Sequence, residues 1–340
     1  MWSLSLLLVI ATAVLLALNY PVADAGTDAV IGLVLLTALV YTTVGGLIGR
    51  RLPRNPIGWL LSAIGVSLAF AAFAEQYGLR GLSTAPGSLP SVRSVVSIGN
   101  GAPIFAVAPL LLVVLLFPDG HPSSPRWRPV LGVAIAVDAV GTIGFVLQKA
   151  HVTGLTNLLQ DQGVAFQSTI GVFDTHGASA VVLGVTGALG FSSGLAAIVG
   201  LFLRRRRGSP ELRQQLAWLG YVAVIAVLAF LAAAIRGNSD DVIATVLWSV
   251  LFTDIILGIP LACGIAVLRY RLYELDIVVK KTVVFGVLVA LFTAVYAAVV
   301  IGVGAAIGHR ANTALTFAGA AIAAILFAPY SVGTVRLHSR

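Results

Sequence analysis

Long apolar segments separated by short basic turns restrict the fold of this 340-residue chain more than any other feature. A helix needs about 20 mainly apolar residues to cross a bilayer. Charged residues make up only 10% of the chain, whereas soluble proteins carry about 25%. The sequence therefore predicts an all-α polytopic bundle of about ten membrane spans: Trp2–Leu18, Ala29–Ile48, Ile57–Tyr77, Ala102–Phe117, Val130–Leu147, Ala178–Leu203, Leu216–Ile235, Val242–Leu268, Val283–Ile307 and Thr313–Phe327.

The basic residues predict how these spans are oriented. Most of the 21 Lys and Arg residues fall in alternate turns, including Arg204–Arg207 and the stretch Arg269–Lys281. Lys and Arg beside span ends mark the cytoplasmic side, whereas Asp and Glu contribute little. We therefore expect a multi-pass cell-membrane protein with both termini in the cytoplasm. One membrane domain would cover residues 1–328, followed by a short cytoplasmic tail at 329–340. The lipid bilayer accounts for the net charge of +8, so nucleic acid is not an expected partner.

Four turns on the basic side carry distinctive motifs. They are NPIGWLL from Asn55, FPDG from Phe117 with SPRWRP after it, the basic run leading into RQQLAWL from Arg213, and LRYRLYELD from Leu268 with a later TVVFG. In this order they resemble the multi-span sensor region of bacterial two-component histidine kinases, from about Arg50 to the last span. The resemblance implies an integral membrane signal-input module that leads into cytoplasmic kinase domains.

The chain departs from that family after Phe327, because neither a phospho-accepting histidine helix nor an ATP-binding domain follows. We therefore expect an input module truncated or detached from its kinase, with no enzymatic activity, catalytic residue or cofactor of its own. The resemblance implies a cytoplasmic kinase or a response regulator as partner. Gly184, Gly187, Gly190 and Gly194 form one smooth helix face, for which packing within the bundle is the default explanation and a homodimer is the second.

The turn after the eighth predicted span is the expected output end. If this turn is helical, Arg271 meets Glu274 and Asp276 meets Lys280, because residues three or four apart share a face. Two interpretations remain open: a salt-bridged surface turn, and a joint that carries a signal out of the bundle. The candidate signal joint consists of Arg269, Arg271, Glu274, Asp276, Lys280 and Lys281.

Asp138 and Asp254 lie far inside predicted spans. An ionisable residue at the centre of a membrane helix costs about 2.5–3.5 kcal/mol, so each acid needs a partner, water or protonation. Pro260 would leave a free carbonyl acceptor near Asp254. Together with Asn100 and Pro103, these residues form the candidate intramembrane sensing or ligand site. The structural alternative is that both acids are neutral and hydrogen-bonded to neighbouring helices.

Asn100 and Pro103 also bear on the fourth span, which they interrupt. Irregular backbone at membrane depth survives only where protein or water covers it. A pocket mouth near Asn100 is one interpretation, and a loop that ends at Gly101 is the simpler one.

Two other functional classes fit the sequence. A small-molecule or proton-coupled transporter would use Asp138 or Asp254 as its site, although no internal repeat of the kind found in transporters is evident. A non-catalytic subunit would dock a partner through the basic face. No metal site is expected, because His151, Asp161, Asp174 and His176 are too widely spaced for a ligand signature.

Overall fold

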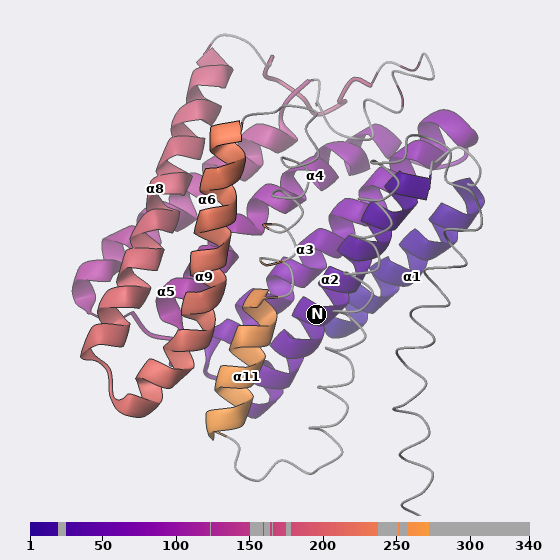
Figure 1. Cartoon of the computed structure of the whole chain (residues 1–340). Coiled ribbons are helices and arrows are strands. Elements are labelled where there is room, and N and C mark those ends of the chain that lie inside the picture. The colour runs from indigo at the N-terminus through magenta and orange to yellow at the C-terminus, as the bar shows by residue number, and fades with distance from the viewer. Residues whose placement is uncertain are drawn as a thin grey trace, which may run out of the picture. The chain divides into compact units, whose positions relative to one another are not determined.

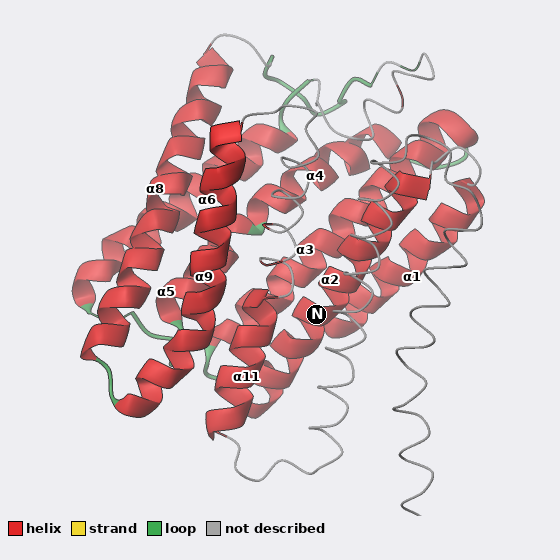
Figure 2. Cartoon of the chain, in the orientation of Figure 1, coloured by secondary structure: helices red, strands yellow, loops and turns green. Residues whose placement is uncertain are grey.

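The computed structural model describes residues 1–19, 25–122, 124–149, 159, 164, 166–174, 178–236, 251, 254 and 258–271. Across these residues the structure is helical, as predicted, and the one β contact there is an isolated bridge between Gln148 and Phe173 (Figure 2). The chain divides into two units. One comprises Met1–Val224 and Ile256–Leu275, and the other comprises Ile225–Ile255 and Asp276–Arg340.

Six helical stretches among the described residues are long and apolar enough to cross a membrane. They overlap the first six predicted spans, although the fourth begins at Val92, ten residues before the predicted start at Ala102. The fourth of them is divided between α4 and α5. The helices in chain order are α1 (Trp2–Asn19), α2 (Ala25–Arg51), α3 (Pro56–Leu79), α4 (Val92–Phe105), α5 (Val107–Leu116), α6 (Arg128–Val146), α8 (Ala178–Arg207), α9 (Pro210–Arg236) and α11 (Ile259–Arg271) (Figure 1).

The later predicted spans are described in part. The seventh predicted span is helical in α9, and α11 covers the C-terminal half of the eighth. The ninth and tenth spans, Val283–Ile307 and Thr313–Phe327, lie outside the described residues. The span number of ten therefore stays a prediction.

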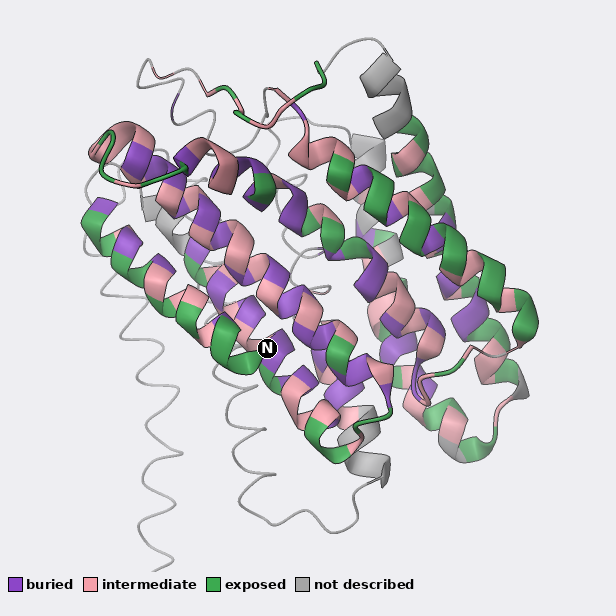
Figure 3. Ribbon diagram, turned by 180° about the vertical axis from the view of Figure 1, so that it is seen from behind, coloured by how far each residue is buried: buried purple, intermediate pink, exposed green. Residues whose placement is uncertain are grey.

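The core of the first unit lies between α2 and α3, where glycine allows the two backbones to touch. A Cβ atom on Gly45 would lie 2.6 Å from the carbonyl oxygen of Gly58 and from the amide of Ser62. A Cβ on Gly65 would lie 2.6 Å from the carbonyl oxygen of Ala38. Helices can approach this closely only where the side chains are small. Viewed from behind, α2 and α3 carry most of the buried residues, whereas α6 and α8 carry longer exposed stretches (Figure 3).

The glycine face predicted on α8 behaves differently. A Cβ atom added to Gly184 or Gly187 would have no neighbouring atom within 4 Å, and one on Gly194 would lie 3.5 Å from Leu111. A Cβ on Gly190 would have equally loose surroundings, at 4.0 Å from Val137. Within the described part of the chain this face therefore makes only ordinary contacts, and the homodimer stays a prediction.

Side-chain hydrogen bonds join α1 to the far end of α3. Asn19 donates from Nδ2 to both the backbone oxygen and Oε1 of Gln76, at 3.0 and 2.9 Å. The hydroxyl of Thr84 donates to Oδ1 of Asn19, and Arg80 donates to the carbonyl of Leu18. These bonds satisfy buried polar groups and fix the register of α1 against α3.

The fourth span is broken, but not where the sequence suggests. Asn100, Gly101 and Pro103 all lie within α4, which continues to Phe105, so the expected loop ending at Gly101 is wrong. The break falls at Ala106. Pro109 explains the position, because a proline ring clashes with the carbonyl four residues earlier, here that of Phe105, and offers it no N–H.

Candidate functional site

The helix break places a backbone amide opposite Asp138. Ala108 is the second residue of α5, and its N–H donates to Oδ1 of Asp138 on α6 at 2.9 Å. The first amides of a helix have no partner within that helix, and a carboxylate is favoured beside them. Asp138 is only 9% exposed. One oxygen of this buried acid therefore caps α5 from a neighbouring helix.

Two further polar groups lie buried in the pair of helices around this break. Asn100 Nδ2 on α4 and Thr142 Oγ1 on α6 have no hydrogen-bond partner among the described residues. The two helices pack closely, since a Cβ on Gly101 would lie 3.2 Å from the carbonyl oxygen of Thr142. A Cβ on Gly141 of α6 would lie 3.4 Å from Ile104 of α4. Burying an unpaired polar group in an apolar surrounding costs free energy. The amide of Asn100 and the hydroxyl of Thr142 could therefore each form a further hydrogen bond at this interface.

The structure thus places three of the predicted sensing residues in one pair of helices. Asn100 and Pro103 belong to α4, and Asp138 belongs to α6. Asp254 belongs to the other unit, whereas Pro260 is the second residue of α11 in the first. Asp254 Oδ2 is buried without a described partner. The free carbonyl acceptor expected near Asp254 is that of Ile256, which lies outside the described residues, so this part of the site stays a prediction.

The predicted signal joint is described only at its start. Arg269 and Arg271 lie in the last turn of α11. Glu274, Asp276, Lys280 and Lys281 lie outside the described residues. Of the four outer-loop residues weighed as metal ligands, Asp174 forms an ion pair with Lys149 at 3.1 Å, and His151, Asp161 and His176 lie outside the described residues.

At the opposite end of α5, two of the sequence motifs are joined through Asn55. Its Oδ1 accepts the amide of Ile57 at 3.0 Å and caps α3, a position at which asparagine is strongly favoured. Its Nδ2 donates to the carbonyl of Pro118 at 3.0 Å. Gly120 sits against this cap with a φ of 78°, and a Cβ there would lie 2.9 Å from Oδ1 of Asn55. Only glycine suits both that backbone conformation and that space.

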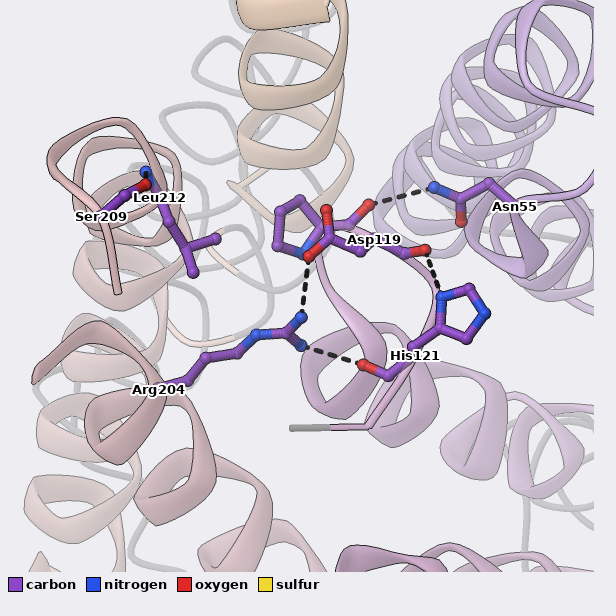
Figure 4. Close-up of polar contacts among 7 residues, drawn as sticks. Asn55, Asp119, His121, Arg204, Ser209 and Leu212 are labelled. Atoms are coloured by element: carbon purple, nitrogen blue, oxygen red, sulfur yellow. Dashed lines mark hydrogen bonds and ion pairs between the residues drawn. The ribbon is translucent and has the colours of Figure 1, made fainter. Parts of the chain in front are cut away.

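Arg204 joins the third motif to the same loop. Its Nη2 donates to Oδ2 of Asp119 at 3.0 Å, and its Nη1 donates to the carbonyl of His121 at 3.1 Å (Figure 4). Nδ1 of His121 lies 2.9 Å from the carbonyl oxygen of Asp119, which tightens the turn. The side chain of Arg204 is 12% exposed and that of Asp119 is 41% exposed. One arginine of the basic run is therefore turned inward as a clamp.

The turn between α8 and α9 completes this end of the bundle. Oγ of Ser209 accepts the amide of Leu212 at 3.3 Å, and Arg213 donates to the carbonyl of Gly208 at 3.0 Å. We call Asn55, residues 117–121, Arg204 and residues 208–213 the loop cluster. The sequence analysis did not predict the ion pair between Asp119 and Arg204. The signal that could have indicated it is a single acidic residue in a turn rich in Pro and Gly, on the side of the bundle where the basic turns lie.

The clamp predicts a measurable coupling between Asp119 and Arg204. In a double-mutant cycle of Asp119→Asn and Arg204→Gln, we expect a coupling free energy of about 0.5–2 kcal/mol, because the pair is half-buried and charge-assisted. Arg204→Lys should lose most of it, since lysine cannot form both bonds in fixed geometry. Unfolding in detergent micelles measures these values. Arg205→Gln is the control, and additive effects of the two clamp substitutions would contradict the clamp.

Comparisons of the chain with family models, with curated proteins and with solved structures found no match.

Proposed function

We propose that this chain is a membrane signal-input module that acts on a cytoplasmic kinase. In this proposal it crosses the cell membrane ten times, has both termini in the cytoplasm, and carries the loop cluster on the cytoplasmic side. The motif resemblance supports the proposal. So does the fact that three of the four motifs, far apart in the sequence, contact one another in the loop cluster.

The single observation that carries the proposal is the position of α5. Asp138 holds the amide of the second residue of this helix, and the helix ends at Leu116, just before Phe117, which is fully buried at the start of the loop cluster. Its ten residues span about 15 Å. A short rigid helix with one end on a buried acid and the other on a hydrogen-bonded loop is suited to transmit a displacement.

The mechanism follows from these contacts. A stimulus that favours release of the Ala108 amide from Asp138 would free the first turn of α5. Movement of α5 would then displace Pro118 and Asp119, which contact Asn55 and Arg204. The stimulus must bind or stabilise one of the two arrangements better than the other, because only differential free energy shifts such an equilibrium.

The proposal predicts that substitutions at both ends of α5 change the activity of an associated kinase. The full chain, isolated with its partner from membranes and reconstituted in liposomes, would be assayed for ATP-dependent histidine phosphorylation. Asp138→Ala and Arg204→Gln should each change the rate, because each removes a bond at one end of α5, whereas Arg205→Gln should not. Phosphorylation that is equal in all four proteins would contradict the proposal.

A transporter is the second candidate, and one observation favours it. Discontinuous helices beside intramembrane acids are also how many transporters build their sites, and α4, α5 and Asp138 have that arrangement. Proteoliposomes with an enclosed pH-sensitive dye separate the two functions. Proton flux that is abolished by Asp138→Asn or Asp254→Asn, with no associated phosphorylation, would establish the transporter instead.

A further inference from the structure

The end of α8 carries a second surface, distinct from the residues of the loop cluster. Leu195, Val199, Phe202 and Leu203 are exposed. Val199 follows Leu195 by four residues, Phe202 and Leu203 follow Val199 by three and four, and Arg206 follows them by four and three. Residues so spaced share one face of a helix. Exposed residues gather along α8 in the rear view (Figure 3). One apolar stripe therefore ends in an exposed guanidinium group.

A different segment of the chain, with an aromatic residue between two basic ones, contacts α8 near this stripe. A Cβ on Gly200, next to Val199, would lie 2.9 Å from Cη2 of Trp127, so the indole ring covers the backbone of α8 there. Trp127 belongs to the short helix η2 (Pro125–Trp127), and Arg126 and Arg128 on either side of it are exposed. The contact of Trp127 with Gly200 therefore anchors these two arginines on a segment that meets α8 six residues before Arg206.

These arginines are available for a ligand. Within the described part of the chain, the side chains of Arg126, Arg128 and Arg206 take part in no hydrogen bond or ion pair. Asp119, the acid of the adjoining loop, is bonded to Arg204. The surface thus combines unneutralised positive charge with an exposed apolar stripe.

We propose that this surface binds an anionic phospholipid, with the headgroup phosphate on the arginines and an acyl chain along the stripe. Guanidinium groups bind phosphate oxygens through paired, charge-assisted hydrogen bonds. An indole ring at the same level is typical of the membrane interface. Eleven helical steps from Leu195 to Arg206 give about 16 Å, close to half of the roughly 30 Å hydrocarbon core. A free phosphate ion or an acidic protein would use the charges but leave the stripe unused.

This surface, the α8 lipid site, consists of Arg126, Trp127, Arg128, Arg206 and the stripe on α8. It does not depend on the proposed signalling function. It requires only that α8 crosses a bilayer, for which its length and composition suffice.

The test is lipid binding to the full chain in mild detergent, followed by native mass spectrometry with phosphatidylglycerol or phosphatidylcholine. We expect the parent protein to prefer phosphatidylglycerol. The triple variant R126Q/R128Q/R206Q should bind it at least about fivefold more weakly, since each basic residue near anionic lipid contributes about 1 kcal/mol. The matched control is R50Q/R51Q/R54Q, which removes three exposed arginines near the end of α2. Its affinity should remain within about twofold of the parent, because none of these three arginines belongs to the α8 lipid site.

Two further experiments distinguish a phospholipid site from a site for free phosphate and from diffuse electrostatic attraction. Val199→Ser with Leu203→Ser should weaken phosphatidylglycerol binding while all three arginines remain, and inorganic phosphate should not displace the lipid. Equal losses in the two arginine triple variants would show diffuse attraction and overturn the site. Displacement by phosphate, with no effect of the serine substitutions, would also overturn it. Each variant is compared only if its thermal melting temperature matches that of the parent protein, which shows that the variant is folded.

Discussion

Gly45→Ala is expected to lower the free energy of unfolding by about 1–3 kcal/mol, although alanine is normally the better residue in a helix. The added methyl group would lie 2.6 Å from the Gly58 carbonyl oxygen and equally close to the Ser62 amide. Both are backbone atoms, so no side-chain rotation relieves the clash. The helices α2 and α3 would have to separate, and that would loosen the best-packed contact of the first unit.

The neighbouring residue supplies a matched control. Gly46 has no atom within 4 Å of a Cβ position. Gly46→Ala should therefore leave stability unchanged or raise it by up to about 1 kcal/mol, through helix propensity alone. Unfolding of both variants in mixed micelles with increasing denaturing detergent measures the difference. If the two alanines have the same effect, close packing of α2 on α3 is contradicted.

Asp138→Ala is expected to expose the amide of Ala108 to hydrogen exchange. The carboxylate is the described partner of that N–H at 2.9 Å, and an unpaired buried donor costs about 1–3 kcal/mol. Removal of a buried acid offsets part of this cost, so exchange at Ala108 is a sharper measurement than global stability. Asp138→Asn should retain most of the protection, because the amide oxygen of asparagine can still accept the bond.

Thr142→Val is the control for this experiment. Thr142 Oγ1 is buried on the same helix without a described partner. Replacing its hydroxyl with a methyl group should leave Ala108 exchange unchanged and stability equal or slightly higher. Rapid exchange at Ala108 in the threonine variant, or continued protection in Asp138→Ala, would show that the acid does not hold the start of α5.

The break in the fourth span shows the limit of the sequence pattern. Asn100, Gly101 and Pro103 together suggest an interruption, yet α4 continues through all three. Neighbouring helices pack against α4 there, and the Ser67 hydroxyl of α3 donates a hydrogen bond to the carbonyl of Ala102. Proline and glycine are tolerated in membrane helices that pack in this way against other helices. Which helices those are cannot be read from local composition.

In the loop cluster, too, the sequence predicts local contacts but not distant ones. Asn55 as a helix cap was predictable, because the cap and the amide it accepts are two residues apart. Its second bond reaches Pro118, 63 residues away, and Arg204 reaches Asp119 across 85 residues. These partners are set by the order in which the helices pack. The motifs therefore marked the segments but not their contacts.

The sequence alone determined that the described chain is helical and which segments contain its first six apolar helices, because hydrophobic length and backbone hydrogen bonding are local requirements. Tertiary structure decided that Asp138 caps α5, that Arg204 clamps the loop after α5, and that Trp127 lies on α8. A polar or aromatic side chain takes the partner that packing brings within a few ångströms. Many packings satisfy the same hydrophobic pattern, so only the folded arrangement selects those partners.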